Sequence, residues 1–334
     1  MNQSNGTKAT SSQSEILLAE GLRMVYASRV ALQDLSFSLK AGRVLGFLGP
    51  NGAGKTTAIR ILTTIMAPTA GRFVIDGVTS DHPEKIRSRI GVLPESLGFQ
   101  KQSTALELLT YFGQLYGRTA SDAKATGLAL LEEVGLQQRA RTLIGTFSRG
   151  MRQRLGIART LVNDPVVVFL DEPTLGLDPH GQHELLALIQ RVARERNTAV
   201  VLCSHLLSEI EDVCDDVVIM NSGRVVAHGT VNEVVGGAQQ NVLRVHVPTS
   251  VVGRAKHVLE GLPGVMNVSP RGSMAGWLVV ALADSVDGMA AQELRAKNNI
   301  LDMLMRADIP IQAYETKAGR LQDVFFELTE EGIK

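Results

Sequence analysis

A glycine-rich segment of the chain has the composition of a loop that holds a polyphosphate. Residues 49–56 read Gly-Pro-Asn-Gly-Ala-Gly-Lys-Thr and fit the pattern G-x-x-x-x-G-K-S/T. Glycines let backbone N–H groups turn inward around an anion, and a helix that begins behind the loop adds its positive end. In this pattern we expect Lys55 to reach the β- and γ-phosphates and the Thr56 hydroxyl to bind Mg²⁺. A chance match is expected in about one chain of this length in a hundred.

A pair of acidic residues ends an apolar run later in the chain. Residues 166–172 read Val-Val-Val-Phe-Leu-Asp-Glu, which predicts a buried strand. Neither acid belongs in the core, because an unpaired buried charge costs several kcal/mol. At the carboxyl end of the strand both acids could reach a nucleotide site. We therefore expect Asp171 to orient Mg²⁺ and Glu172 to polarise the attacking water. Taken alone, the pair would equally fit a solvated strand end.

The elements around these motifs follow in the order that a phosphate-binding loop requires. Residues 43–48 predict a strand, the glycine-rich turn comes next, and residues 55–65 have helical apolar spacing. From about residue 97 to residue 161 the spacing is again helical, which indicates a helical insertion. The other expected elements are an opening hairpin region at 16–25 and 30–39, strands at 166–170 and 199–203 with a helix at 184–194 between them, and a closing hairpin at 217–221 and 224–227.

The pattern of the last part of the chain predicts a small α+β domain and suggests the ferredoxin-like type. Its start follows Gly-Gly-Ala-Gln-Gln at 236–240, which has the composition of a linker. The elements expected beyond it are strands at 242–247, 277–282 and 309–314 and helices at 252–259, 290–307 and 320–331.

Composition excludes several classes of protein. The 334 residues include 34 Lys and Arg and 34 Asp and Glu, and this balance gives no electrostatic reason to expect nucleic-acid binding. Two cysteines, Cys203 and Cys214, form neither a disulfide framework nor a zinc motif, so a reducing compartment is expected. No apolar run approaches the length of a membrane span, and residues 1–14 lack the apolar core of a signal peptide. We therefore expect a soluble chain that could dock onto a membrane protein.

A third segment carries a family resemblance. Residues 147–155 read Phe-Ser-Arg-Gly-Met-Arg-Gln-Arg-Leu and resemble the signature segment of ATP-binding-cassette (ABC) proteins, whose usual form is Leu-Ser-Gly-Gly-Gln. The departures at Phe147, Arg149 and Met151 are similar to those of bacterial drug-export and ABC-2-type cassettes. The resemblance implies that Ser148 and Gly150 bind the γ-phosphate of ATP held by an opposite subunit. Ser148 also fits a plain helix N-cap.

Other positions resemble the family in order. Tyr26 resembles the aromatic residue that stacks on adenine, although a surface tyrosine fits as well. Asp178 lies in a Gly-Leu-Asp segment that resembles the loop crossing the dimer interface. His205 resembles the histidine that contacts the γ-phosphate. Glu95 stands where the family usually has Gln, and when ionised it accepts but does not donate hydrogen bonds and adds negative charge near Mg²⁺.

These patterns and the resemblance, which covers about residues 15–235, predict an α/β P-loop NTPase of the ABC cassette type. The expected parts are a disordered tail at 1–14, a nucleotide-binding domain at 15–236 with a mixed sheet, an antiparallel β subdomain and a helical subdomain at about 97–163, and a small α+β accessory domain at 241–334. Catalytic roles are expected for Glu172, His205 and Lys55, and magnesium ligands are expected at Thr56, Asp171 and Glu95. The expected nucleotide-binding residues are Tyr26, Gly49, Asn51, Gly52, Ala53, Gly54, Lys55, Thr56, Thr57, Glu95, Ser148, Gly150 and Asp178.

The resemblance implies an ATPase subunit of a membrane ABC transporter, and specifically of an ABC-2-type exporter. Residues 321–329, Leu-Gln-Asp-Val-Phe-Phe-Glu-Leu-Thr, also resemble the ending of such exporters. The implied cofactors are ATP and Mg²⁺. The implied partners are a second cassette, in a homo- or heterodimer, and separate polytopic permease subunits at the inner face of the cell membrane. Two alternatives are a cassette ATPase that acts on nucleic acid, ribosomes or an assembly process, and a regulatory ATPase whose C-terminal domain senses a ligand.

Overall fold

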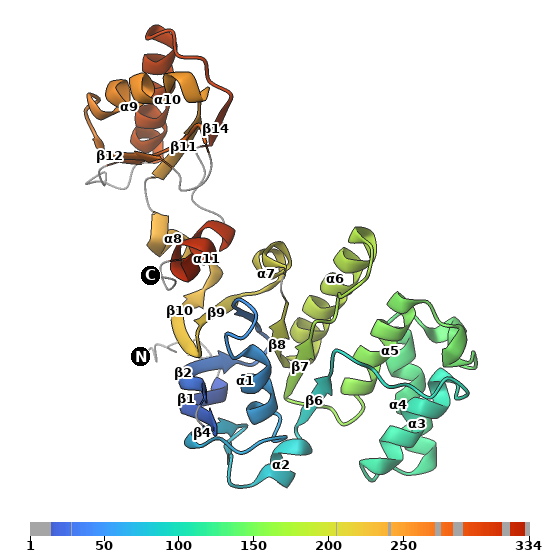
Figure 1. Cartoon of the computed structure of the whole chain (residues 1–334). Coiled ribbons are helices and arrows are strands. Elements are labelled where there is room, and N and C mark those ends of the chain that lie inside the picture. Colours follow the sequence, from blue (N-terminus) through green and yellow to red (C-terminus); the bar gives the residue numbers. More distant parts are fainter. Residues whose placement is uncertain are drawn as a thin grey trace, which may run out of the picture. The chain divides into compact units, whose positions relative to one another are not determined.

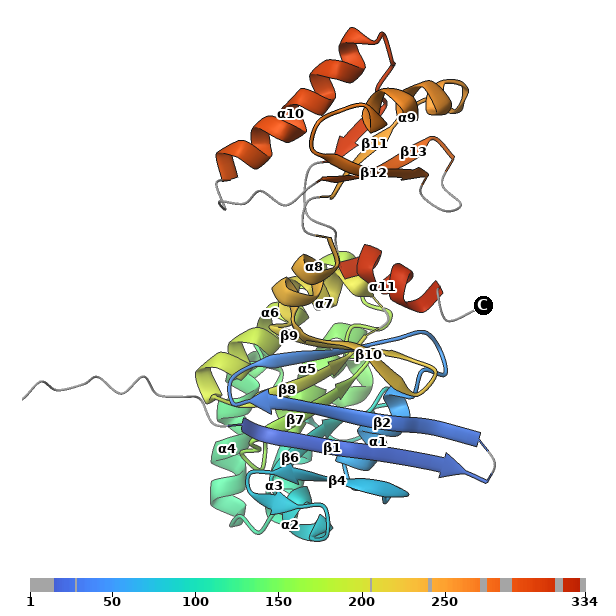
Figure 2. The same cartoon turned by 90° about the vertical axis from the view of Figure 1, so that its left-hand side faces the viewer.

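The computed structural model describes residues 15–27, 29–204, 206–239, 242–270, 275–282, 290–315 and 321–330. Contacts divide the chain into two compact units, which are Met1–Val231 together with Glu327–Lys334, and Asn232–Phe326 (Figures 1 and 2). The tail predicted at 1–14 lies outside the described residues. Among the described residues, no helix is long and apolar enough to cross a bilayer.

The first unit is built on a ten-stranded mixed sheet. The strands lie in the order β5 (Val78–Thr79), β4 (Ala70–Ile75), β1 (Glu15–Tyr26), β2 (Arg29–Lys40), β10 (Arg224–Thr230), β9 (Asp216–Asn221), β3 (Val44–Leu48), β8 (Ala199–Cys203), β7 (Val167–Asp171) and β6 (Ile90–Leu93). Strands β5, β4, β1 and β2 pair antiparallel, whereas β9, β3, β8, β7 and β6 pair parallel. The mixed sheet and its antiparallel portion agree with the predicted fold class.

The parallel strands have the near-continuous apolar runs of strands that are buried on both faces. All five residues of β3 are buried, and so are all five of β8. Helix α1 (Lys55–Leu62) follows β3, and α6 (Pro179–Arg196) leads from β7 to β8. Parallel strands place their carboxyl ends at one edge of the sheet, so the segments after β3, β6 and β7 meet there.

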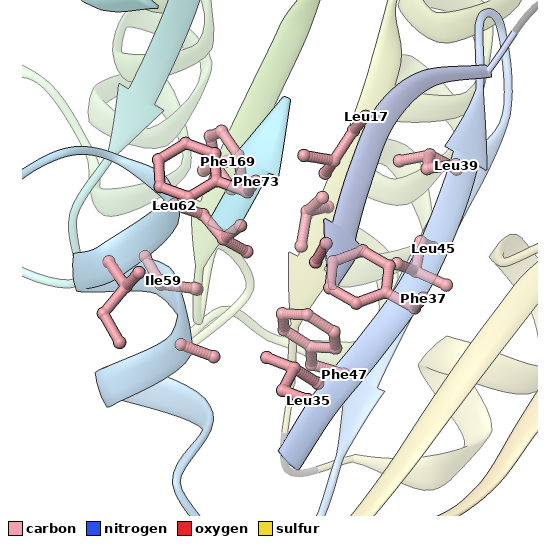
Figure 3. Close-up of a cluster of buried hydrophobic side chains, with 14 of the residues drawn as sticks. Leu17, Leu35, Phe37, Leu39, Leu45, Phe47, Ile59, Leu62, Phe73 and Phe169 are labelled. Atoms are coloured by element: carbon pink, nitrogen blue, oxygen red, sulfur yellow. The ribbon is translucent and has the colours of Figure 1, made fainter. Parts of the chain in front are cut away.

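One apolar core joins the antiparallel and parallel portions beneath α1 (Figure 3). Phe37 of β2 meets Phe47 of β3 edge to face, with ring centroids 5.3 Å apart. Leu62 of α1, Phe73 of β4 and Phe169 of β7 pack into the same cluster. Each large apolar side chain buried in this way contributes about 1.5 to 3 kcal/mol. The core therefore fixes α1, and the loop before it, against both portions of the sheet.

The predicted helical insertion consists of α3 (Ala105–Leu115), α4 (Ala120–Glu133) and α5 (Arg149–Thr160), which lie together beside β6 (Figure 1). Helix α3 begins with a capping box in which Thr104 and Glu107 bond each other's backbone N–H. Helix α5 approaches the sheet closely at Gly156, where a Cβ atom would stand 2.5 Å from Leu93 Cδ1.

The second unit has the βαββαβ order of a ferredoxin-like fold. The elements that form this order are β11 (Val242–His246), α9 (Val252–Glu260), β12 (Val265–Pro270), β13 (Trp277–Leu282), α10 (Ala290–Arg306) and β14 (Ala313–Glu315). The sheet order is β12-β13-β11-β14, and every pair is antiparallel. Leu243, Val245, Leu278 and Val280 of the sheet form a core with helix residues that include Leu259.

Three local expectations differ from the structure. Strand β12 was not predicted, because Val268 is its single buried residue and the apolar alternation is weak. The predicted linker at 236–240 is helical through residue 239, as the end of α8 (Val231–Gln239). The glycines are tolerated there at about 1 kcal/mol each relative to Ala. The strand expected at 309–314 is shorter in the structure and spans only β14 (Ala313–Glu315). Ile309 lies before this strand and packs into the core of the unit.

The last described residues, Glu327–Glu330, group with the first unit, so the division between the units falls within the last helix. Helix α11 spans Leu321–Glu330, and Asn221 Nδ2 of β9 donates a hydrogen bond to Thr329 O at 3.4 Å. Thr329 is accordingly only 9% exposed. The division at 236–241 stays a prediction, and the contacts change unit between Val231 and Asn232.

Candidate functional site

A cleft of about 830 Å³ opens where the segments after β1, β3, β6 and β7 converge. This volume is in the usual range for a site that holds a nucleotide-sized ligand. The lining residues outside the phosphate loop and α1 include Tyr26, Arg29, Glu95, Asp171 and Glu172. Four segments that are far apart in the sequence therefore share one cavity.

The phosphate loop fills the turn between β3 and α1. Gly54 adopts φ +107° as the N-cap of α1 and Gly52 adopts φ +83°, a region that favours glycine. Lys55 Nζ donates hydrogen bonds to Gly49 O at 2.5 Å and to Pro50 O at 3.3 Å, so the loop curls around its own lysine. No side chain caps α1 and its first turn carries no acid. Its N-terminal N–H groups are thus positioned to receive an anion.

Glycine is required at residue 49 by crowding rather than by its backbone angle. A Cβ atom there would stand 2.5 Å from Met220 O and 2.8 Å from Ala53 Cβ. Ala53 N in turn donates to Pro50 O at 3.1 Å. The loop is therefore held against the end of β9, which leaves its other side facing the cleft.

Carboxylates gather at the opposite wall of the cleft. Asp171 is the last residue of β7, and Glu172 follows it. Burial raises the pKa of Asp171 above its ordinary value of 3.8, and the neighbouring charges of Glu172 and Glu95 raise that pKa further, whereas Arg60 and Lys55 lower it. The wall thus holds negative charge that a divalent cation would offset.

Glu172 is held in an unusual backbone conformation. Its φ is +50°, which is uncommon for a residue other than glycine, and its N–H donates to Cys203 O at 3.0 Å. Leu175 N donates back to Glu172 O at 3.2 Å. Such strained positions cluster at functional sites because the surroundings must over-determine them.

The chemistry of the donor set fits Mg·ATP. The described residues contain no group of three or more His, Cys, Asp or Glu side chains that would hold a metal by themselves. Magnesium prefers oxygen ligands and usually takes one or two from the protein and the rest from phosphates and water. The Thr56 hydroxyl and the Asp171 carboxylate, both in the cleft, are ligands of that kind.

Tyr26 and Glu95 enter the cleft from other elements, and their predicted contacts with nucleotide and magnesium stay predictions. Tyr26 ends β1, is 38% exposed, and its hydroxyl donates to Met66 Sδ at 3.2 Å. Glu95 follows β6, and its charge reaches Asp171. Arg29 and Arg60 also line the cleft and were not predicted. The register of the hairpin, which pairs Tyr26 with Arg29, is the signal that could have identified Arg29.

Ser148, Gly150 and Asp178 do not line this cleft. Ser148 Oγ caps α5 by accepting from Met151 N at 3.2 Å, and Asp178 Oδ1 caps α6 by accepting from Gly181 N at 2.7 Å. A Cβ atom on Gly150 would stand 3.8 Å from Leu177 Cδ2, so the two capped segments are neighbours. Their predicted nucleotide contacts stay predictions, and His205 lies outside the described residues.

The segment after Glu95 is tied to helix α5 by one arginine. Arg159 Nη1 donates to Leu97 O at 3.3 Å, and its guanidinium lies over the rings of Phe99 and Phe112, at 5.2 and 5.5 Å from their centroids. Cation–π contacts of this kind contribute about 0.5 to 2 kcal/mol. The cleft wall and the helical portion of the unit are therefore linked.

The sequence of this chain is similar to those of known ATP-binding proteins. The sequence pattern described as "ABC transporter" matches residues 32–175. The bacitracin transport ATP-binding protein BcrA of Bacillus licheniformis is 42% identical over 64% of this chain and 69% of its own length. The daunorubicin/doxorubicin resistance ATP-binding protein DrrA of Streptomyces peucetius is 33% identical over 92% of this chain and 91% of its own.

Solved structures show the same resemblance in the fold. An ATP-binding subunit of an ABC transporter superposes with a TM-score of 0.58 at 31% identity, over 66% of this chain and 91% of its own. The protein cbiO1 of Clostridium perfringens, part of an ABC transporter complex, superposes with a TM-score of 0.61 at 29% identity, over 66% and 90%.

Proposed function

Because this chain belongs to the ABC transporter family of ATP-binding proteins, we propose that two such cassettes hydrolyse Mg·ATP to drive export through a separate membrane protein. As a member of the family the chain has the predicted fold, and it binds and hydrolyses ATP. One observation carries the assignment of the site. A single cleft brings the phosphate loop with Lys55 together with Asp171 and Glu172.

The residue roles follow from this arrangement. Lys55 and the loop N–H groups bind the phosphates and stabilise the charge that develops during transfer of the γ-phosphoryl group. Thr56 and Asp171 hold the magnesium ion, with Glu95 beside them. When bound there, a magnesium ion would offset the negative charge of the phosphates. Glu172 accepts a hydrogen bond from the attacking water and orients it in line with the bond that breaks.

Half of the site belongs to a second cassette. Ser148 and Gly150 lie outside this chain's cleft, at the exposed start of α5, where a hydroxyl, backbone amides and a helix dipole suit an anion. In the proposed dimer they contact the γ-phosphate held by the partner. ATP then stabilises the closed dimer as a shared ligand, and hydrolysis releases it.

Export is proposed from the relatives. BcrA is named for bacitracin transport and DrrA for daunorubicin and doxorubicin resistance. For this chain we propose the same role, with permease subunits on separate chains at the inner face of the membrane.

The ATPase assignment is tested by the turnover of purified chain with Mg·ATP. We expect turnover in the native chain, none after EDTA treatment, and little in Glu172→Gln. Glu195→Gln, an exposed substitution on α6, is the matched control and is expected to keep native turnover. Unchanged hydrolysis in Glu172→Gln would contradict the role of that residue.

The membrane partner is tested by capture. Tagged Glu172→Gln chain, with ATP, is applied to detergent-solubilised native membranes, and the bound proteins are identified by mass spectrometry. Recovery of a polytopic membrane protein supports the exporter. Recovery of ribosomes, nucleic acid or only soluble proteins would move the assignment to a cassette ATPase that does not transport.

A further inference from the structure

A buried carboxylate outside the cleft joins two segments of the first unit. Glu209, on α7 (Leu207–Val213), is only 5% exposed. Its Oε2 accepts hydrogen bonds from Thr174 Oγ1 at 2.9 Å and from Ser204 Oγ at 2.6 Å. Thr174 and Ser204 are themselves 1% exposed. The contact is therefore a buried, three-residue polar cluster.

Burying a carboxyl group costs free energy unless its hydrogen bonds offset the loss of contact with water. Two hydroxyl donors converge on one oxygen, and Oε1 has no hydrogen-bond partner among the described residues. An apolar residue of similar volume would avoid that penalty. Both hydroxyls are thereby held against the same side chain, at 2.9 and 2.6 Å.

The two hydroxyls belong to segments that carry proposed catalytic groups. Thr174 lies between Glu172 and Asp178, and its carbonyl accepts from Leu177 N at 3.0 Å. Ser204 Oγ also accepts from Leu206 N at 3.1 Å, and residues 204 and 206 flank His205 in the sequence. The backbone also joins these segments, through the bond from Glu172 N to Cys203 O.

We infer that Glu209 is a positioning residue that couples the segment of Glu172 and Asp178 to the segment of His205. The inference rests on the proposed function, which assigns roles to those three residues. Glu209 contacts neither nucleotide nor water in this scheme. It sets the separation of two loops that must approach one γ-phosphate from different strands, β7 and β8. Without the carboxylate, each loop moves separately and Glu172 loses its alignment.

The kinetic test compares Glu209→Gln with Asp212→Asn, which makes the same acid-to-amide change at an exposed neighbour on α7. We expect kcat for ATP to fall about tenfold or more in Glu209→Gln, while KM changes less than about twofold, since misplacement affects the reacting geometry rather than ground-state binding. Asp212→Asn is expected to match the native chain. A native kcat in Glu209→Gln overturns the inference.

A second pair of variants removes the dependence on one substitution. Thr174→Val deletes one donor and leaves the carboxylate in place, and Thr174→Ser restores a hydroxyl. We expect a reduced kcat in the first and a native kcat in the second. The combination of Thr174→Val with Glu209→Gln is expected to be no slower than Glu209→Gln alone, because one cluster is lost once. If the two substitutions lower kcat additively, Thr174 and Glu209 do not act as one cluster, which would contradict the coupling.

A readout that needs no turnover separates this inference from the proposed function. Amide hydrogen exchange is measured on peptides that contain Thr174 and Ser204. In Thr174→Val we expect faster exchange in the Ser204 peptide as well as its own, and no change in Asp212→Asn. Faster exchange confined to the Thr174 peptide overturns the coupling. A native chain that hydrolyses no ATP overturns the proposed function and leaves the exchange result to decide the coupling.

Discussion

The guanidinium of Arg149 lies against Gly176, so near that a Cβ atom on residue 176 would stand 2.5 Å from Arg149 Cζ. Arg149 is the first residue of α5, directly after Ser148, and Gly176 lies two residues before Asp178. The usual family signature has glycine where this chain has Arg149. Arg149 thus covers the segment of Gly176 and Asp178, which the proposed dimer places at its interface. The position of the Arg149 side chain depends on residue 176 being glycine.

Gly176→Ala tests this contact, and Gly77→Ala is its control because both glycines have φ +71° and nothing lies within 4 Å of a Cβ atom at residue 77. We expect both variants to lose about 1 to 2 kcal/mol of stability from the left-handed backbone, as measured by urea unfolding. In Gly176→Ala the flexible end of the Arg149 side chain moves aside, which adds little to the loss of unfolding free energy. Gly176→Ala alone is expected to slow ATP turnover. Equal turnover in the two variants would show that the contact has no role in hydrolysis.

Lys55→Ala is expected to weaken ATP binding at least about tenfold, because the charge-assisted hydrogen bonds to the phosphates are lost. The loop also loses the bonds from Nζ to Gly49 O and Pro50 O that close it. Isothermal titration calorimetry with ATP measures the affinity. Lys40→Ala, an exposed position at the end of β2, should bind as the native chain does. An unchanged affinity in Lys55→Ala argues against this phosphate loop.

Tyr26→Ala is expected to weaken ATP binding by about 1 to 3 kcal/mol, the range for stacking of a base on an aromatic ring. Tyr26→Phe keeps the ring and loses only the hydrogen bond to Met66 Sδ, so its affinity should stay near native. The same calorimetric titration distinguishes the two. Equal affinities in Tyr26→Ala and the native chain would remove Tyr26 from the site.

Tyr314 makes the second unit sensitive to alkaline pH. Burial raises the pKa of Tyr314 from 10.0 to about 12. The folded state therefore keeps its proton more tightly than the unfolded state, and the stability due to this difference is present below pH 10 and is lost as the pH rises toward 12. Tyr314→Phe should lose less stability across that interval.

Urea unfolding followed by fluorescence of Trp277, the single tryptophan and a residue of the same unit, measures the effect. Tyr111→Phe, at a tyrosine that is 58% exposed, should leave the native pH dependence unchanged. A native loss of stability between pH 10 and 12 in Tyr314→Phe would assign the alkaline sensitivity to another group.

The sequence alone was sufficient where a motif is short and its geometry is local. The phosphate loop at 49–56 and the acids at 171 and 172 were predicted with their strands, because backbone N–H groups, glycine conformations and a strand end are set by neighbouring residues. Buried apolar strands in a mixed sheet and a ferredoxin-like second unit were also expected, since apolar periodicity reports burial, but the expected order of elements in that unit lacked β12. Weakly alternating β12 was missed for the same reason.

Only the tertiary structure decided which distant residues meet. Tyr26, Arg29 and Glu95 enter one cleft because strand pairing and the core around Phe47 bring β1, β2 and β6 to the phosphate loop. The cluster of Glu209 with Thr174 and Ser204 has no sequence signature, since three common polar residues become unusual only when they are buried together. Burial and long-range pairing are properties of the whole fold, so no local pattern contains them.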